Sequence, residues 1–385
     1  MSTSREIWID WLRVSACFMV MLVHSTEPFY LGGDGALILT RADAFWAGIF
    51  DCLARCCVPL FVVASSYLQF PLHYSTGEFF RRRAVRVLVP FAIWSIFYAL
   101  WWGEPVQNLK DLLLNFNYAA GHLWFVYMLI GLYLVMPLLS PWAETVTKKE
   151  LQVYIGIWLF TTLIPILREW LSGGVTLVYG PTGIPRQAPY PLWGEASWNN
   201  TGAFYYVSGM IGYLLIGLYF RRFVGEMSTR KALTIGVPCY LAGFAICFFG
   251  FLRRVFAVGT FPAAGDLTMA VDWETTWFFD TTGVALMTIG LILFFRRING
   301  AGVFYEKVLL PVSEASYGMY LMHMVVLAAV SGWFRSTLGL GETGALGVWT
   351  TPVQIVGTAV CSFLCVSILA LLLQRIPRVG KYLMG

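Results

Sequence analysis

Long apolar stretches, separated by short polar segments, run through almost the whole chain. A helix needs about 20 apolar residues to cross the hydrocarbon of a bilayer, where it satisfies its own backbone hydrogen bonds. Ten stretches reach or approach this length: 8–30, 45–69, 86–102, 122–141, 151–171, 203–220, 231–251, 276–295, 308–330 and 350–374. The pattern predicts an all-α polytopic membrane protein of about ten helices, with residues 1–385 forming one transmembrane domain. The stretch 203–220 is short and rich in glycine, and a broken or tilted helix is expected there.

The composition excludes several other classes of protein. Hydrophobic residues make up 58% of the chain and charged residues only 12%, whereas about a quarter of the residues in a soluble domain are charged. This excludes an ordinary soluble enzyme and a disordered chain. The eight cysteines all lie in apolar stretches, which is typical of small core residues rather than of a disulfide framework. The expected environment is a lipid bilayer, and no nucleic-acid partner is expected.

The basic residues predict the orientation, because loops rich in Lys and Arg stay cytoplasmic. One set of loops, together with both termini, carries seventeen of the 26 basic residues, and the alternate loops carry seven. The remaining two, Arg13 and Arg55, lie inside predicted spans. Both termini are therefore predicted to be cytoplasmic.

The first span contains four ionisable residues on one side of the helix: Asp10, Arg13, His24 and Glu27. At about 100° per residue, His24 returns to within about 20° of Arg13 and lies about 16 Å further along the axis. Asp10 and Glu27 lie within about 60° of the same line. A charge in the bilayer costs several kcal/mol, so this stripe must line a cavity or a polar seam between helices.

His24 is suited to accept and return a proton near neutral pH, and Glu27 is close enough to orient it. A hydrogen bond from His24 to a neighbouring helix is the structural alternative. Asp10 and Arg13 are three residues apart and could neutralise each other or serve a site directly. In the second span, Asp51 and Arg55 are four residues apart in apolar sequence. This pair fits either a wall of charge beside a reaction site or a structural bridge.

The segment GEFFRRRAVRVLVPF places four arginines, Arg81, Arg82, Arg83 and Arg86, at the predicted inner face. In an α-helix, Arg82 and Arg83 would share a face with Arg86. Arginine binds phosphate through two parallel hydrogen bonds, so the cluster predicts a phosphate site. Its alternative role is to orient the helix in the membrane.

Three of the four histidines are predicted at one depth: His24, His122 and His323. His122 and Trp124 open the fourth span, and Tyr317, Tyr320 and His323 lie in the ninth. Three histidines can bind zinc, but these come from different helices without a set of carboxylates, and no metal is expected. The longest outer segment, 172–202, is rich in Gly, Pro and Trp. An ordered cap and an interfacial anchor fit it equally.

Five motifs resemble acyltransferase family 3, membrane proteins that acylate sugars of bacterial envelopes and other lipophilic acceptors. IDWLRVSACFMVMLVH resembles the family's D-x-L-R…H first helix, and RRRAVRVLVPF resembles its R-x-x-R element before a proline. GHLWFV resembles the H-L-W-F element and SYGMYLMH the S-Y-x-x-Y-L-x-H element. VPLFVVASSYL resembles the second-helix run, although Ser65-Ser66 stands where the family usually has Ser-Gly. Each motif is weak alone, but the five occur in the family's order along the whole chain.

The resemblance implies an acyl-CoA donor, usually acetyl-CoA, that arrives from the cytoplasm at a bacterial inner membrane. By the same resemblance His24 is the essential histidine, and Arg83 and Arg86 bind the CoA phosphates. Glu27 is expected to assist His24, and Arg13 and Arg82 to assist the arginines. The residues expected around the acceptor are Asp10, Asp51, Arg55, His122, Trp124, Tyr317, Tyr320 and His323. Some relatives carry an added esterase-like domain, and this chain is expected to be the form without it.

The leading hypothesis is therefore an O-acyltransferase, most simply an O-acetyltransferase, acting on a cell-envelope glycan or a lipid-linked sugar. A proton-coupled transporter also suits buried ionisable residues in ten spans, but no internal match between residues 1–190 and 191–385 supports it. A scaffold or sensor without catalytic activity is the third reading, and it requires the buried ionisable residues to tolerate substitution. The sequence does not indicate an oligomeric state.

Overall fold

The structure, a computed structural model, describes residues 5–32, 35–112, 118–171, 193, 199, 201–339 and 343–385. Most of the outer segment 172–202 lies outside these residues, and with it the expectation of a cap or an anchor. The helices are α1 (Ile7–Thr26), α2 (Arg41–Ala54), α3 (Cys57–Gln69), α4 (Thr76–Arg83), α5 (Val89–Trp101), α6 (Pro105–Asp111), α7 (Trp124–Thr145), α8 (Lys148–Leu171), α9 (Ile211–Phe223), α10 (Thr229–Ala257), α11 (Leu267–Glu274), α12 (Thr282–Phe295), α13 (Leu310–Leu338), α14 (Thr350–Gln374) and α15 (Gly380–Met384). Three short strands are β1 (Leu31–Gly32), β2 (Gly35–Ile38) and β3 (Ala263–Asp266).

Eight helical segments of the described chain are long and apolar enough to cross a membrane: Ile7–Phe29, Arg41–Gln69, Thr76–Trp101, Ala120–Thr145, Lys148–Leu167, Thr229–Ala257, Tyr305–Leu338 and Gly347–Gln374. The prediction of an all-α polytopic membrane protein is confirmed. The stretches predicted at 203–220 and 276–295 contain the shorter helices α9, of 13 residues, and α12, of 14 residues. The count of ten spans stays a prediction.

Two predicted spans are broken within the described chain. The stretch 45–69 consists of α2 and α3, which are separated by a turn at Arg55 and Cys56. The stretch 203–220 begins as a 3₁₀ helix, Gly202–Val207, and continues as α9 after a bend at Gly209. Gly209 has φ +74°, a conformation that glycine adopts without the steric cost of a side chain.

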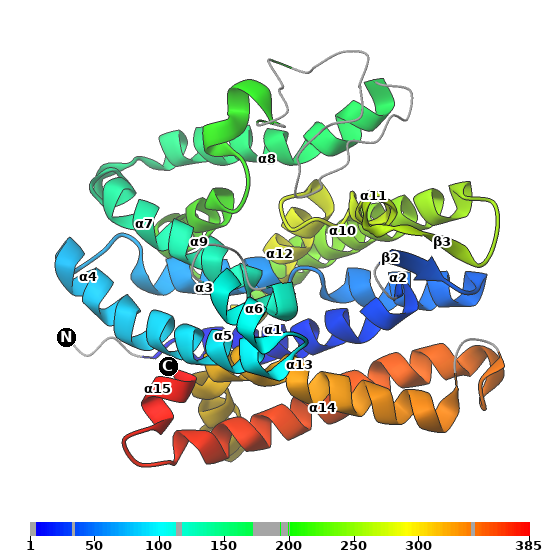
Figure 1. The fold of residues 1–385 in the computed structure, drawn as a ribbon. Coiled ribbons are helices and arrows are strands. Elements are labelled where there is room, and N and C mark those ends of the chain that lie inside the picture. Colours follow the sequence, from blue (N-terminus) through cyan, green and yellow to red (C-terminus); the bar gives the residue numbers. More distant parts are fainter. Residues whose placement is uncertain are drawn as a thin grey trace.

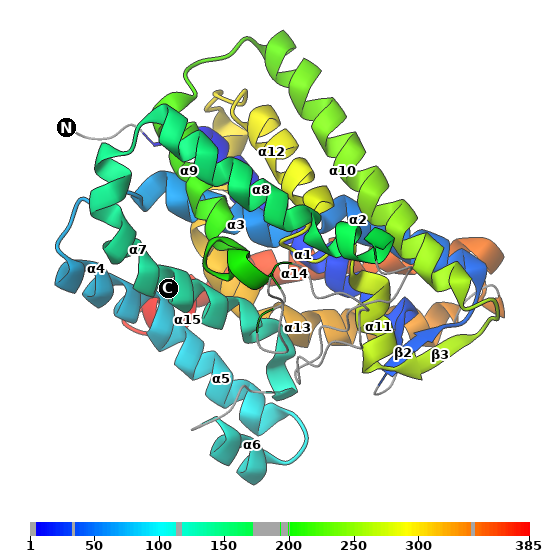
Figure 2. The same ribbon diagram turned by 90° about the horizontal axis from the view of Figure 1, so that it is seen from above.

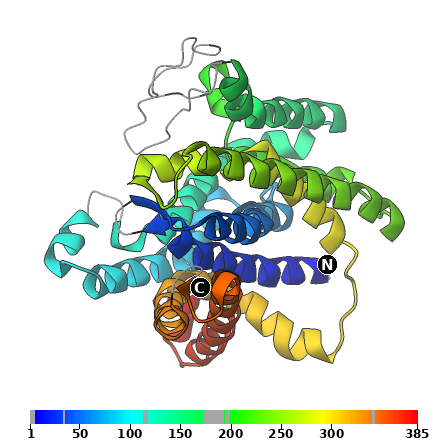
Figure 3. The same cartoon turned by 90° about the vertical axis from the view of Figure 1, so that its right-hand side faces the viewer.

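Helix α1 lies at the centre of the bundle. It packs against α2, α3, α13 and α14, and Figure 3 shows α13 and α14, in orange and red, side by side beneath the blue α1. The residues of α1 that are completely buried include Leu12 and Ala16. Because helices surround α1, its polar stripe faces protein or cavities between helices rather than lipid.

Helices α10 and α12 pack tightly against each other. A Cβ atom on Gly243 would lie 2.3 Å from the carbonyl oxygen of Gly283, and one on Gly290 would lie 2.6 Å from that of Gly236. Small residues allow membrane helices to approach this closely, so that backbone packs on backbone. This contact places the start of α12 beside α10.

A small antiparallel sheet covers one end of the bundle and was not predicted. Its strand order is β1-β2-β3, and the pairing of β2 with β3 joins Gly35 to Asp266 and Ile38 to Ala263. Figure 2 shows the sheet at the far end of α10, next to α11. Because β1 follows α1 and α11 follows β3, the sheet ties α11 to the end of α1. The opposite end of the bundle carries α4 and the C-terminal α15 (Figure 1).

Two helices begin with a π-helical turn directly before a proline. In the first, Ala84–Leu88, the N–H of Val89 donates to the carbonyl of Ala84. Pro90 has no N–H to give the carbonyl of Arg86, and its ring would clash with that carbonyl in a regular α-helix. The second, Tyr305–Leu309, precedes Pro311 in the same way. The wider turn changes the direction of every side chain that follows it.

Candidate active site

His24 and Glu27 form a hydrogen-bonded pair at the end of α1. His24 Nδ1 lies 2.8 Å from Glu27 Oε1, and both side chains are partly accessible, at 18% and 29%. Glu27 begins a short 3₁₀ helix, Glu27–Phe29, in which Pro28 turns the chain away from the axis of α1. With Nδ1 held by a carboxylate, His24 Nε2 is the nitrogen available to a ligand.

Three histidine rings from three elements meet at this end of α1. The ring centroid of His323, on α13, lies 5.0 Å from that of His24 and 5.0 Å from that of His122. His122 belongs to the 3₁₀ helix Tyr118–Leu123, just before α7. The structure therefore brings together the three histidines that the sequence placed at one depth.

The hydrogen bonds of α13 limit what His323 can do. Its Nδ1 lies 2.6 Å from the carbonyl oxygen of Tyr320, so the neutral ring carries its proton on Nδ1 and a lone pair on Nε2. Nε2 is buried without a partner among the described residues. Tyr320 donates its hydroxyl to the carbonyl of His122 at 2.5 Å. Neutral His323 can accept a hydrogen bond from a substrate but cannot donate one to an oxyanion.

A second polar cluster lies beside this site. Arg55 and Asp51 form the ion pair that their spacing predicted, and Thr26 donates to Asp51 at 2.8 Å. Arg55 also donates to Glu274 at 3.1 Å and to the hydroxyl of Tyr30 at 3.0 Å. Since Thr26 is two residues after His24, this cluster braces the end of α1 that carries the histidine.

Glu274 and Tyr30 were missed by sequence reasoning. Tyr30 donates to Glu274 at 2.8 Å, and Glu274 ends α11, a helix that was not predicted. One signal could have located that helix: Asp266 caps it by accepting from the N–H of Met269 at 3.2 Å, and Asp is a preferred residue at this position. No pattern in the sequence links α11 to Arg55, because the contact depends on the sheet.

The Asp10–Arg13 pair that the spacing allowed does not form. Asp10 instead accepts from Arg5 at 2.7 Å, from Tyr305 at 2.8 Å and from Ser313 at 2.6 Å. The hydrogen bond to Asp10 raises the pKa of the Arg5 guanidinium above its ordinary value, so Arg5 stays charged. Through these hydrogen bonds Asp10 links α1 to Ser313 of α13 and to Tyr305 just before it.

Arg13 is left without a partner as a consequence. It is half-buried and forms no hydrogen bond or ion pair with any described residue. It lies within electrostatic range of Tyr133 on α7, and Arg83 lies over the same ring, with its guanidinium carbon 5.4 Å from the centroid. The Nε of Arg83 is buried and has no hydrogen-bond partner in the described part of the chain. Two uncompensated guanidiniums therefore approach Tyr133 from α1 and α4.

The other arginines of the cluster have different surroundings. Glu78 accepts from Arg81 at 2.9 Å and from Arg82 at 2.7 Å, and Arg82 stacks on Tyr74 at 4.2 Å. Arg86 lies within the π-helical segment Ala84–Leu88 and is exposed. The shared face predicted for Arg82, Arg83 and Arg86 assumed a regular α-helix, and the π-turn before Pro90 breaks that register.

Tyr317 holds this turn through its hydroxyl group. Its hydroxyl donates to the carbonyl of Val87 at 2.9 Å, and Val87 lies within the π-helical segment. A π-turn disturbs the regular pattern of backbone hydrogen bonds, so a hydroxyl from a neighbouring helix stabilises it. Tyr317 therefore positions the segment that follows Arg83.

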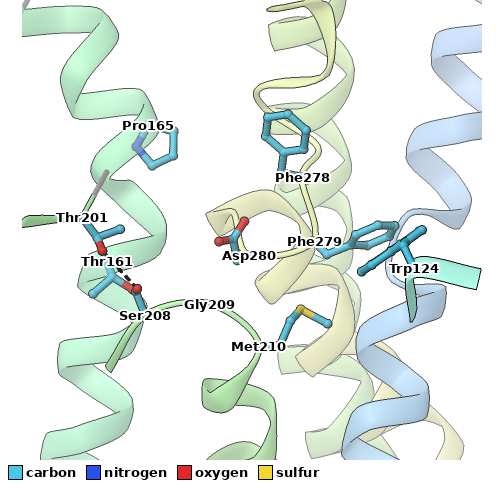
Figure 4. Close-up of a pocket in the computed structure, with 10 residues that line it drawn as sticks. All are labelled: Trp124, Thr161, Pro165, Thr201, Ser208, Gly209, Met210, Phe278, Phe279 and Asp280. Atoms are coloured by element: carbon cyan, nitrogen blue, oxygen red, sulfur yellow. Dashed lines mark hydrogen bonds between the residues drawn. The ribbon is translucent and has the colours of Figure 1, made fainter. Parts of the chain in front are cut away.

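A pocket of about 280 Å³ opens beside Trp124. Trp124 stacks on Phe279, with ring centroids 5.2 Å apart, and the guanidinium of Arg55 lies 5.8 Å from the same phenylalanine ring. Figure 4 shows Trp124 and Phe279 on one side of the pocket and Thr161 and Ser208 on the other. Trp124, which lines this pocket, is two residues from His122 in the chain. No group of three or more His, Cys, Asp or Glu side chains that could hold a metal ion is present in the part of the chain that the structure describes.

The family model described as an acyltransferase domain, that of acyltransferase family 3, matches residues 6–371. No curated protein and no solved structure matches the chain. The match extends from the residue before α1 almost to the end of α14, so it covers both the histidines and the inner arginines. The chain belongs to acyltransferase family 3 and is a multi-pass membrane acyltransferase.

Proposed function

We propose that this protein transfers an acyl group, in the simplest case acetyl, from acyl-CoA to a hydroxyl of a cell-envelope glycan or a lipid-linked sugar. The donor binds at the end of the bundle that carries α4 and α15, and the reaction takes place at His24. The protein resides in a bacterial inner membrane with both termini in the cytoplasm. The excess of basic residues at the α4 end supports this orientation.

One observation carries the proposal: the two ends of a single buried helix hold complementary groups. At one end, Arg13 of α1 and Arg83 of the neighbouring α4 have no carboxylate counter-ion among the described residues, and the His24–Glu27 pair lies at the other end. Arg13 and His24 are about 16 Å apart along α1. An acyl-CoA molecule has a phosphorylated head and a long flexible arm that ends in the thioester, and it can bridge this separation.

At the reaction end, His24 acts as general base. Its Nε2 accepts the proton of the acceptor hydroxyl while the oxygen attacks the thioester carbonyl carbon. The carbon–sulfur bond then breaks, and the CoA thiolate takes the proton back from His24. Glu27 accepts the Nδ1–H bond, which orients the ring and stabilises its protonated form in the transition state. His323 Nε2, which can only accept in the neutral ring, accepts from a second hydroxyl of the acceptor and so helps to orient it.

At the donor end, we expect fewer residues to bind phosphate than the four arginines of the segment 81–86. Arg83 and Arg13 bind phosphate oxygens, because neither is neutralised by a carboxylate of the described chain. Arg82 and Arg81 already share Glu78, so an added phosphate gains less from them. Arg86, exposed beside them, adds positive charge at the surface.

Replacing Arg83 by Gln is expected to raise KM for acetyl-CoA about 10- to 100-fold, with a smaller change in kcat. A hydrogen bond to a charged group contributes about 1.5–3 kcal/mol, and every 1.4 kcal/mol is a factor of ten. The measurement is the release of CoA thiol by purified protein in lipid nanodiscs. Arg82→Gln is the matched control, with a smaller rise in KM. Equal effects of the two variants would contradict the role of Arg83.

The function itself is tested by supplying purified protein with radiolabelled acetyl-CoA and a glycan fraction from the envelope. Transfer of label to the glycan supports the proposal, and mass spectrometry of the product identifies the acceptor and the added mass. Transport of a sugar into liposomes that needs neither acetyl-CoA nor His24 would contradict it.

A further inference from the structure

The pocket beside Trp124 has two chemically different walls. One is apolar and consists mainly of Trp124, Phe279 and Met210. The other carries hydroxyl groups from Thr161, Thr201 and Ser208, and Asp280 lies at its edge (Figure 4). Ligand pockets in proteins measure about 300–1,000 Å³. At about 280 Å³ this pocket has room for one six-membered sugar ring.

The walls are held in place by hydrogen bonds from buried aromatic residues. Trp158 donates its indole N–H to the carbonyl of Gly209 at 2.7 Å, and Tyr213 donates to the carbonyl of Phe279 at 2.6 Å. The hydroxyls of Thr162 and Thr282 lie 3.0 Å apart and join α8 to α12. The pocket is therefore built into the fold and not a surface irregularity.

The side-chain groups of the polar wall are acceptors. The hydroxyl proton of Thr161 goes to the carbonyl of Trp158 at 2.7 Å, and that of Ser208 has the carbonyl of Tyr205 at 2.9 Å. Thr201 has Asn199 Oδ1 as an acceptor. The hydroxyl oxygens of Thr201 and Ser208 also lie 3.1 Å apart, so one of them accepts from the other. Even so, each oxygen keeps a lone pair for a ligand. Asp280 is an acceptor when ionised, and it forms no hydrogen bond or ion pair with another described side chain.

Such a wall requires a ligand that brings several O–H donors and no negative charge. A phosphate or carboxylate group would find no side-chain donor there and would be repelled by Asp280. A neutral sugar ring offers hydroxyl donors around its edge and an apolar C–H face for the aromatic wall.

Two series of contacts join this pocket to His24. Trp124 follows His122, whose ring lies 5.0 Å from that of His323, and His323 lies 5.0 Å from His24. Phe279 lies beneath Arg55, which binds Asp51. We propose that the pocket formed by Trp124, Phe279 and Asp280 binds one neutral sugar ring of the acceptor, and that Asp280 excludes acidic sugars. This inference rests on the proposed function.

The test measures sugar binding without any acyl donor, so that it does not depend on catalysis. The probes are methyl hexopyranosides of the gluco, galacto and manno series and the matching methyl glucuronoside, in which a carboxylate replaces the C6 hydroxymethyl group of the gluco probe. Saturation-transfer NMR on the protein in nanodiscs gives the affinities. We expect at least one neutral probe to bind, and the glucuronoside to bind at least tenfold more weakly than its neutral counterpart.

Asp280→Asn removes the charge and keeps the shape, and we expect it to reduce the discrimination against the glucuronoside to about twofold or less. Glu104→Gln is the matched control, because Glu104 is an exposed carboxylate outside the pocket, and it should leave the discrimination unchanged.

Thr161→Trp fills the pocket and should abolish binding of the neutral probe. Competition by a lipid-linked hexose or by a soluble oligosaccharide then distinguishes the two sources of the sugar.

Three outcomes would overturn the inference: no neutral probe binds, the glucuronoside binds as well as the neutral probe, or Asp280→Asn leaves the discrimination unchanged. CoA release from acetyl-CoA, measured on the same preparations, separates this from the proposed function. If CoA is released but no sugar binds, the proposed function stands and the pocket is ruled out as a sugar-binding site. If sugar binds but no acetyl group is transferred, the proposed function is contradicted and the pocket remains a sugar-binding site.

Discussion

Replacing His24 by Asn is expected to lower the rate of acyl transfer about 10²- to 10⁴-fold, the usual contribution of a general base. The Asn side chain fills about the same space as the imidazole atoms nearest the backbone. It cannot, however, take a proton from the acceptor hydroxyl. Its position at the end of α1 is held by the contact of Thr26 with Asp51, so the fold should survive. The measurement is acetyl transfer from acetyl-CoA to the envelope glycan fraction, with the protein in nanodiscs.

His73→Asn is the matched control for this prediction. His73 is exposed near the other end of the bundle, where its Nε2 lies 3.2 Å from Arg221, and its loss should leave transfer unchanged. Binding of acetyl-CoA to the His24 variant should also be unchanged, because the phosphates bind about 16 Å away. A His24→Asn protein that binds the donor and still transfers acetyl at the normal rate would remove His24 from the mechanism.

Replacing Arg55 by Met is expected to lower the free energy of unfolding by about 3–5 kcal/mol, the range for breaking a buried ion pair. The change leaves the buried Asp51 and the partly buried Glu274 side by side without their cation. It also removes the contact of the guanidinium with Trp277, 4.7 Å from the ring centroid. Buried cysteines allow unfolding to be followed with a thiol-reactive dye, since Cys52, Cys56 and Cys57 are inaccessible in the folded chain.

A second variant distinguishes the loss of charge balance from poor packing. When both Asp51→Leu and Arg55→Met are present, most of the stability should return, because an apolar pair of similar volume can replace a buried ion pair. Arg82→Met, which affects an exposed pair with Glu78, should change the unfolding temperature little. If Arg55→Met unfolds at the wild-type temperature, the cluster does not support the end of α1.

The prediction of helices was most successful where apolar stretches were long, as for α1, α10 and α14. It was least successful where a proline or a glycine changed the local geometry. The π-turn before Pro90 moved Arg86 off the face of Arg82 and Arg83, and the bend at Gly209 separated α9 from the helical turn before it. The sheet that carries α11 was missed because its strands have two to four residues, too few for a periodic pattern to be recognised.

By itself, the sequence determined that this protein lies in a membrane and that one helix carries Arg13 and His24 on the same side, because both follow from helix length and periodicity. It also determined the ion pair of Asp51 and Arg55, which is a contact between neighbouring turns. Only the tertiary structure decided which charges stay unpaired. Asp10 is bound by Arg5 rather than Arg13, and Glu274 reaches Arg55 from a distant helix. The spacing along a helix specifies which residues share a face, but the distance between helices decides which charges are neutralised.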